Sequence, residues 1–360
     1  MFDIVVVNNG LAGGGTERQS TTFANFVSEE GYSVKIIASH RSKHFYKLDQ
    51  RVEFIEPSFE RKGYTLFFYT IKVLRFLRKE ISKSEATTVF SYNESLNPFV
   101  ILVCLGLGIN VFVRESMHPK AKLPLPTELL RKWLYPLAKG VLVQTNYGQK
   151  ILSHNIPKAT VHAIPNPVKM FNLNIADTRN RRIVSVGRLE EVKGHKYLIE
   201  AFARIDNKGW ELHIIGDGSM RDELENLADS LKLGDFVTFH GHLIDFEEIL
   251  STAEIFVLPS IKEGFPNALI EAMSVPLACV SGDYYEGSPE IIEDGINGLL
   301  FEPRNVEALS NTLQMLVEND KLRESLKAKA ELVKKKYNLD KIGLEYLKIF
   351  RIYESKKNSK

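Results

Sequence analysis

Residues 256–271 read Phe-Val-Leu-Pro-Ser-Ile-Lys-Glu-Gly-Phe-Pro-Asn-Ala-Leu-Ile-Glu. The apolar run at 256–258 predicts a buried strand, and residues 259–264 predict a turn. Pro266 suits the first position of a helix, where its missing N–H costs nothing. A strand, a turn and a helix in this order indicate an α/β fold. The amides of residues 264–267 would then point out of the helix N-terminus, which favours binding of an anion.

Two glutamates bracket this segment. Glu263 falls in the turn, and Glu271 falls one to two turns inside the helix. At 1.5 Å rise per residue, their carboxylates are at most about 12 Å apart. The spacing suits an elongated ligand with hydroxyls at both ends and an anion in the middle, such as a nucleotide sugar. It equally suits an amphipathic helix with two solvated acids, so the spacing alone leaves both interpretations open.

Length and composition indicate a two-domain globular protein. The chain has 360 residues, of which 44% are hydrophobic and 26% charged. A net charge of +2 gives no general attraction to nucleic acid. Cys104 and Cys279 lie in apolar surroundings and predict two buried thiols in a reducing compartment. We expect no signal peptide, because Met1 runs directly into a predicted strand, and therefore a cytoplasmic protein.

Short runs rich in Val and Ile alternate with longer helical patterns along the whole chain, which predicts parallel sheets covered by helices on both faces. The predicted strands are 3–7, 34–38, 52–55, 87–90, 110–113, 140–144, 161–164, 182–186, 211–215, 236–239, 255–258 and 277–280. A polar, turn-rich stretch at 165–182 interrupts the pattern. We therefore predict two Rossmann-like domains, residues 1–167 and 168–338. A charged helix at about 339–356 would pack back on the first domain.

A glycine-rich loop, residues 10–15, follows the first predicted strand. Its glycines do not follow the G-x-G-x-x-G pattern, and residues 39–41 provide no acid after the second strand. Both facts disfavour a nicotinamide site. Either the loop is a tight turn, or a ligand passes close to Gly14 and Gly15.

Cations and glycines follow the predicted strands of the second half. Arg188 and Lys193 come after 182–186, at the end of the strand where ligands of open α/β sheets bind. Both cations suit phosphate, although two surface cations in a loop would look the same. Histidines 240 and 242 follow 236–239, but no further ligands accompany them, and we predict no metal site.

Together these motifs resemble the retaining glycosyltransferases of family 4. The resemblance rests on Gly187-Arg188-Leu189 with Lys193-Gly194, and on residues 216–218, 263–271, 289–292 and 297–299. Residues 14–18 and 164–168 are similar to that family's N-terminal loop and interdomain hinge. The resemblance covers nearly the whole chain. It implies the GT-B fold, in which two Rossmann-like domains with parallel sheets face each other across a cleft that holds the active site.

The resemblance also implies roles for individual residues. Arg188 and Lys193 would hold the donor diphosphate, Glu263 the sugar hydroxyls and Glu271 the ribose. The other donor-binding candidates are Gly14, Gly15, Gly187, Gly216, Gly218, His240, Gly241, His242, Gly264, Phe265, Pro266 and Asn267. The donor would be a nucleotide-sugar substrate, and neither a cofactor nor a metal is implied.

The loop after the strand at 110–113 departs from the common family pattern. Many relatives carry a histidine there, whereas this chain reads Arg-Glu-Ser-Met-His-Pro at 114–119. It is similar to a variant among polysaccharide-building members, with glutamate at the key position. Glu115 is therefore a candidate catalytic residue and His118 a possible sugar contact. An ordinary polar loop remains the alternative.

Residues 61–83 and 120–139 mix basic and apolar side chains, which suits helices lying on an anionic membrane, or helices packed on their own sheet with a solvated basic face. The resemblance implies a retaining, metal-independent transferase of hexose or N-acetylhexosamine from a nucleotide-diphospho-sugar, with UDP as the expected nucleotide. Its acceptor would be a glycan, lipid-linked at the inner membrane face, in polysaccharide or lipopolysaccharide assembly. The alternatives are a nucleotide-sugar epimerase and a non-catalytic nucleotide-sugar-binding protein.

Overall fold

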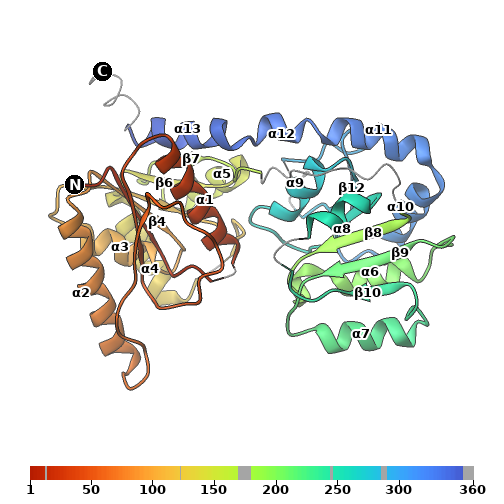
Figure 1. The fold of residues 1–360 in the computed structure, drawn as a ribbon, viewed down its shortest axis with the longest axis horizontal. Coiled ribbons are helices and arrows are strands. Elements are labelled where there is room, and N and C mark those ends of the chain that lie inside the picture. The colour runs from red at the N-terminus through yellow and green to blue at the C-terminus, as the bar shows by residue number, and fades with distance from the viewer. Residues whose placement is uncertain (13, 122, 169–179, 244–245, 285–289, 352–360) are drawn as a thin grey trace. The chain divides into compact units, whose positions relative to one another are not determined.

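The computed structural model describes residues 1–360 except 13, 122, 169–179, 244–245, 285–289 and 352–360 (Figure 1). The chain divides into two compact units, Met1–Pro167 with Leu339–Lys360, and Val168–Asn338. In the described part of the chain, every helix is too short or too polar to cross a membrane.

The first unit is built on a seven-stranded sheet in the order β3-β2-β1-β4-β5-β6-β7, and every pairing is parallel. Its strands are β1 (Ile4–Asn8), β2 (Val34–Ala38), β3 (Glu53–Ile55), β4 (Thr88–Tyr92), β5 (Asn110–Arg114), β6 (Gly140–Val143) and β7 (Val161–Ala163). Its helices are α1 (Gly15–Glu29), α2 (Leu66–Ser84), α3 (Asn97–Cys104), α4 (Leu125–Leu134), the 3-10 turn η1 (Tyr135–Leu137), α5 (Asn146–Asn155) and α13 (Leu339–Ile349).

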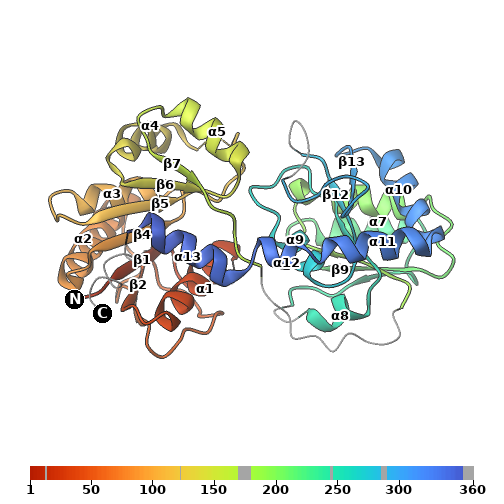
Figure 2. The same ribbon diagram turned by 90° about the horizontal axis from the view of Figure 1, so that it is seen from above.

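The last described helix, α13, belongs to the first unit although it is far from it in sequence (Figure 2). Tyr346 and Phe350 pack against Phe23 and Phe90, with ring centroids 5.0–6.0 Å apart. At Gly343 the helix lies so close to α1 that an added Cβ would be 2.2 Å from the ring of Phe26. Residues 352–356 of the predicted helix lie outside the described residues.

Arg114, at the end of β5, is the largest fully buried side chain. Its guanidinium donates to the carbonyl of Ile164 at 3.3 Å and to Oδ1 of Asn166 at 2.5 Å. Its Cζ lies 5.4 Å from the ring centroid of Tyr346. Burial lowers the pKa of Arg114 to about 10. One buried cation thus joins β5, the segment after β7 and α13.

The second unit has a six-stranded sheet, also parallel, in the order β10-β9-β8-β11-β12-β13. Its strands are β8 (Arg182–Val186), β9 (Glu211–Ile215), β10 (Val237–Phe239), β11 (Ile255–Leu258), β12 (Ala278–Gly282) and β13 (Leu299–Phe301). Its helices are η2 (Glu191–Lys193), α6 (His195–Phe202), α7 (Arg221–Ser230), α8 (Glu247–Thr252), α9 (Asn267–Ser274), α10 (Val306–Glu318), α11 (Asp320–Ala330) and α12 (Val333–Lys336). Apolar clusters cover both faces of the sheet.

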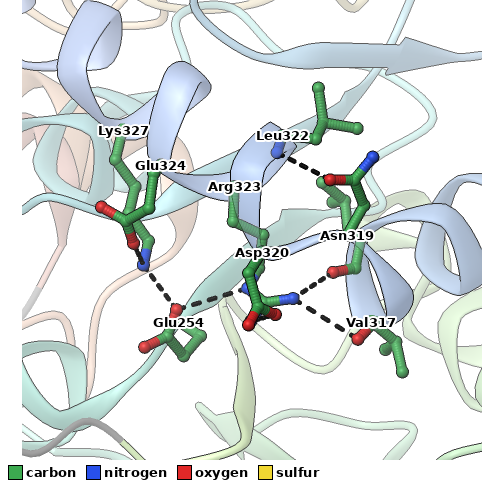
Figure 3. A network of polar contacts seen from close by, with 9 residues as sticks. Glu254, Val317, Asn319, Asp320, Leu322, Arg323, Glu324 and Lys327 are labelled. Atoms are coloured by element: carbon green, nitrogen blue, oxygen red, sulfur yellow. Dashed lines mark hydrogen bonds and ion pairs between the residues drawn. The ribbon is translucent and has the colours of Figure 1, made fainter.

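An ionic network secures α11 to the sheet beside β11 (Figure 3). The carboxylate of Glu254 accepts from Lys327 at 2.5 Å and from Arg323 at 3.4 Å. Arg323 also donates to the carbonyl of Leu316 and pairs with Asp320. The two cations are mostly buried, so removing Glu254 would leave them without their shared anion.

The predicted α/β class with two Rossmann-like parallel sheets is confirmed, and every predicted strand is present with ends shifted by at most two residues. β13 was missed because its three residues directly follow a turn motif. Cys104 and Cys279 are buried free thiols, as predicted, and burial raises the pKa of Cys104 to about 12.

Candidate functional site

Loops from three neighbouring strands touch at the carboxyl edge of the second unit's sheet. The N–H of Gly187 donates to Ile215 at 2.9 Å, and the N–H of Gly216 donates to Gly241 at 2.8 Å. Gly216 has a φ of 145°, and a Cβ there would lie 1.8 Å from the carbonyl oxygen of Gly187. A Cβ at Gly218 would lie 2.5 Å from the carbonyl oxygen of Leu189. These loops are packed so closely that only glycine fits at both positions.

The loop after a fourth strand, β11, contacts the loop after β8 through side chains. Lys193 donates to Oε1 of Glu263 at 2.6 Å, and Ser260 donates to the same oxygen at 2.7 Å. The side chains of Lys193 and Glu263 are 20% and 10% exposed, so the ion pair is only partly hydrated. Gly194 has a φ of 70°, and a Cβ there would lie 2.1 Å from the carbonyl of Pro259. The structure thus brings together the predicted phosphate-binding lysine and the predicted sugar-binding glutamate.

Arg188 directly follows Gly187 at the end of β8 and is exposed. Among the residues that the structure describes, no salt bridge engages its guanidinium, in contrast to Lys193. The arginine is therefore available to an anion from solvent.

The glutamate at the end of residues 256–271 is buried. Glu271 lies in α9 and is 3% exposed, which excludes the solvated-acid interpretation for this residue. Pro266 is the residue before the helix rather than its first residue, one position from the prediction. Phe265 and Pro266 are buried, and Phe265 packs edge-on against Tyr337.

The backbone around Asn267 is partly satisfied within the turn, since its N–H donates to Phe265 at 3.0 Å. Gly264, three residues before Asn267, is half-buried.

His240, the first residue after β10, forms a hydrogen bond with the ring of His213. His213 was not singled out from the sequence. Gly241 follows with a φ of 70°, and His242 lies in the same loop. The other histidine that sequence reasoning missed is His195, at the start of α6. It is fully buried beside Gly187, and neither ring nitrogen meets a hydrogen-bond partner among the described residues. Burial and the charge of Lys193 lower the pKa of His195 to about 4, so this ring is neutral at pH 7.

In the first unit, Gly14 precedes α1 and Gly15 begins it. The hydroxyl of Tyr46 donates to the carbonyl of Gly14 at 3.1 Å. A Cβ at Gly14 would lie 2.1 Å from a carboxylate oxygen of Glu17, whose side chain folds back over the loop. Gly13 lies outside the described residues.

Glu115 follows β5 at the carboxyl edge of the first unit's sheet, where it pairs with Arg131 at 2.9 Å. Burial is the main cause that raises the pKa of Glu115, and the charge of Arg131 opposes it. His118 accepts from the N–H of Lys120 at 3.2 Å. Glu94, missed in the sequence, accepts from the N–H groups of Ser116 and Met117 and so holds this loop. The candidate acid is thus a partner in an ion pair.

Within the described ranges, no group of three or more His, Cys, Asp or Glu side chains is arranged to hold a metal.

Comparison with known proteins gives a consistent result. The family described as Glycosyl transferases group 1 matches residues 169–333. A Haemophilus influenzae protein described as an uncharacterized glycosyltransferase is 29% identical over 95% of this chain and 97% of its own length.

A second relative, from Campylobacter jejuni, is 26% identical over 97% of this chain and 98% of its own. It is named GalNAc-alpha-(1->4)-GalNAc-alpha-(1->3)-diNAcBac-PP-undecaprenol alpha-1,4-N-acetyl-D-galactosaminyltransferase. Among solved structures, S. aureus TarM in complex with Fondaparinux, alpha-GlcNAc-glycerol and UDP superposes with a TM-score of 0.82. The match is 15% identical and covers 97% of this chain and all of that one, which supports the shared fold.

Proposed function

We propose that this chain, a glycosyltransferase of GT-B fold whose residues 169–333 match the Glycosyl transferases group 1 family, uses a UDP-linked hexose or N-acetylhexosamine as its donor. It works in the assembly of polysaccharide or lipid-linked glycan.

The Lys193–Glu263 pair is the observation that carries the donor proposal. A cation and a carboxylate that meet at 2.6 Å beside glycine loops offer one group for a phosphate and one for sugar hydroxyls. Arg188 adds a second cation at the same edge. Glu271 would bind the ribose, while the loops at 216–218, 240–242 and 264–267 would line the donor. A nucleoside diphosphate linked to a sugar matches this order of groups.

We propose that transfer retains the anomeric configuration and needs no divalent metal. Arg188 and Lys193 would neutralise the negative charge that develops on the leaving diphosphate. Glu263 is not assigned as a nucleophile, because one of its oxygens already accepts from both Lys193 and Ser260. The acceptor hydroxyl would attack on the face that the diphosphate leaves, and a phosphate oxygen would take its proton.

In the first unit we propose that Glu115 contacts the donor sugar, with His118 as a weaker contact and Gly14 and Gly15 close to the donor. The ion pair with Arg131 would orient the carboxylate of Glu115.

The acceptor that we propose is a lipid-linked glycan at the cytoplasmic face of the membrane. Leu125, Leu129, Trp133 and Leu137 recur at every fourth position along α4 and η1, and all four are 52–79% exposed. The exposed cations Lys132 and Lys139 accompany them. Apolar anchors mixed with cations suit an anionic lipid surface.

A second exposed cluster lies at the start of α2, where Leu66, Phe67 and Phe68 are 62–69% exposed. The rest of α2 buries Tyr69, Val73, Leu77 and Ile81 against its own unit, so the exposed large apolar side chains of the helix lie in its first turn.

Release of UDP from UDP-sugars, measured with and without a lipid-linked glycan, tests the donor proposal. A transferase releases UDP faster when acceptor is present. An epimerase converts the donor sugar with no acceptor, and a non-catalytic binding protein shifts in melting temperature with UDP-sugars but releases nothing. Either of these two results would replace the proposal.

Flotation with vesicles containing anionic lipid tests the membrane proposal. The wild type is expected to float, and Trp133→Ser with Leu129→Ser to float less, while the exposed control His154→Gln is unchanged. If the wild type stays with the soluble fraction, the membrane contact is wrong.

A further inference from the structure

Three titratable side chains form a chain of hydrogen bonds in the second unit. Nε2 of His213 lies 3.0 Å from Oε2 of Glu211, and Nδ1 of His213 lies 2.8 Å from Nε2 of His240. Glu211 and His213 are two residues apart on β9, so they share one face of the sheet. His240 follows the neighbouring strand β10. The contacts run from a half-exposed carboxylate through a buried ring to a half-exposed ring at the carboxyl edge.

The positions of the protons follow from the chemistry of these groups. An ionised Glu211 can only accept, so Nε2 of His213 carries the proton that it receives. Hydrogen bonds from His213 and Arg182 lower the pKa of Glu211, which keeps it ionised. A neutral imidazole has one N–H, so Nδ1 of His213 must accept, and Nε2 of His240 must donate. Nδ1 of His240 is left as an acceptor.

This nitrogen belongs to the loop that lies against the glycine turn after β9. His240 donates its backbone N–H to Ile214, and the carbonyl of Gly241 accepts from Gly216. The described side chains give Nδ1 of His240 no hydrogen-bond partner. Two further charged groups lie near these residues: Arg182, which is 3.4 Å from Glu211, and Arg221, which lies beside Gly241 and pairs with Glu225.

We propose that Glu211 and His213 are positioning residues that hold Nδ1 of His240 as the acceptor for an N–H of the donor's nucleobase. For UDP this donor is the N3–H of uracil. The inference rests on the proposed nucleotide-sugar function and adds how the base is recognised.

The same three residues predict a pH dependence. An added proton ends on Nδ1 of His240 in both possible arrangements. Either His240 keeps both ring protons and carries the charge, or its Nε2 proton moves to Nδ1 of His213 and the charge rests on His213. The acceptor then becomes a donor and opposes the N–H of the base. Burial and the neighbouring His213 and Arg182 lower the pKa of His240. The acceptor form therefore persists through neutral pH, and it is lost only as the pH falls below the ordinary histidine range.

Titration calorimetry with UDP on the full chain, from pH 8 to pH 5, tests the proposal. The wild type is expected to hold its affinity to below pH 6.5 and then lose it. His213→Phe, which leaves the tautomer of His240 unfixed, is expected to bind about fivefold to tenfold more weakly at pH 7.5. Glu211→Leu is expected to behave similarly, whereas Glu211→Gln keeps an accepting oxygen and stays near wild type. His154→Gln is the matched control.

Nitrogen-15 NMR of the histidine rings gives a readout that does not depend on binding. The wild type is expected to show His240 protonated at Nε2, and Glu211→Leu, which alters an exposed position, to show mixed tautomers. A wild-type His240 protonated at Nδ1 at pH 7.5 overturns the proposal, and so does equal UDP affinity in folded His213→Phe and Glu211→Leu. If the wild type binds no UDP, the donor proposal fails instead, and the spectra still decide the hydrogen-bond chain.

Discussion

Replacing Glu263 by glutamine tests the donor site most directly. The change keeps the side chain's size and one accepting oxygen but removes the charge that pairs with Lys193 at 2.6 Å. Hydrogen bonds to charged groups contribute about 1.5–3 kcal/mol, and each 1.4 kcal/mol is a factor of ten. If Glu263 only positions Lys193, the loss in kcat/KM is at the low end of this range, about tenfold, because a neutral bond remains. If Glu263 also binds the sugar in the transition state, kcat falls as well, by about 100-fold or more.

The assay is steady-state release of UDP with acceptor, with kcat and KM separated, on protein whose thermal unfolding matches the wild type. Ser260→Ala is the matched control, since it removes the other donor to the same oxygen of Glu263 and leaves the ion pair. Glu263→Ala is expected to abolish transfer. Turnover of folded Glu263→Gln within about twofold of wild type would refute the role of this carboxylate.

Three other predictions follow from single positions. Gly216→Ala places a Cβ 1.8 Å from the carbonyl of Gly187 at a φ of 145°, so the variant is expected to lose UDP binding in calorimetry and to melt at a lower temperature. Gly343→Ala pushes α13 from the ring of Phe26, and urea unfolding is expected to show a loss of about 1–3 kcal/mol; an unchanged midpoint would contradict this packing. For His195 the folded-state pKa of about 4 lies below the unfolded value of 6.5, so the unfolded chain binds the extra proton and stability falls as the pH drops from 6.5 to 4, by about 3 kcal/mol in total. His195→Leu is expected to remove that part of the slope in urea unfolding at a series of pH values, and an unaltered slope would show that His195 is not its source.

The strands could be predicted because parallel strands buried on both faces are continuous apolar runs, as in Val34–Ala38 and Ile255–Leu258. β13 escaped because its three residues directly follow a turn motif, which hides the short apolar run. In the site, the sequence showed Gly216 and Gly194 as glycines that follow strands. The structure shows why each must be glycine, because a backbone carbonyl lies where a Cβ would be.

Contacts between distant residues could not be read from the sequence. Lys193 and Glu263 are 70 positions apart, and His213 and His240 are 27 apart. Each pair depends on which strands are neighbours and on their register, and neither is encoded locally. For the same reason the burial of Glu271 was undecided, and the partner of Glu115, Arg131 on α4, was not foreseen.

The Lys193–Glu263 pair has a consequence for how the donor is selected. Without ligand, each of these mostly buried charges is the other's partner. A diphosphate that draws Lys193 toward itself leaves Glu263 with weaker compensation, and a carboxylate that loses its partner is costly in a partly dry site. Sugar hydroxyls restore the lost hydrogen bonds, whereas a nucleoside diphosphate without a sugar does not. Under the proposed roles, the pair would couple phosphate binding to sugar binding and would favour the intact donor over the product that must leave.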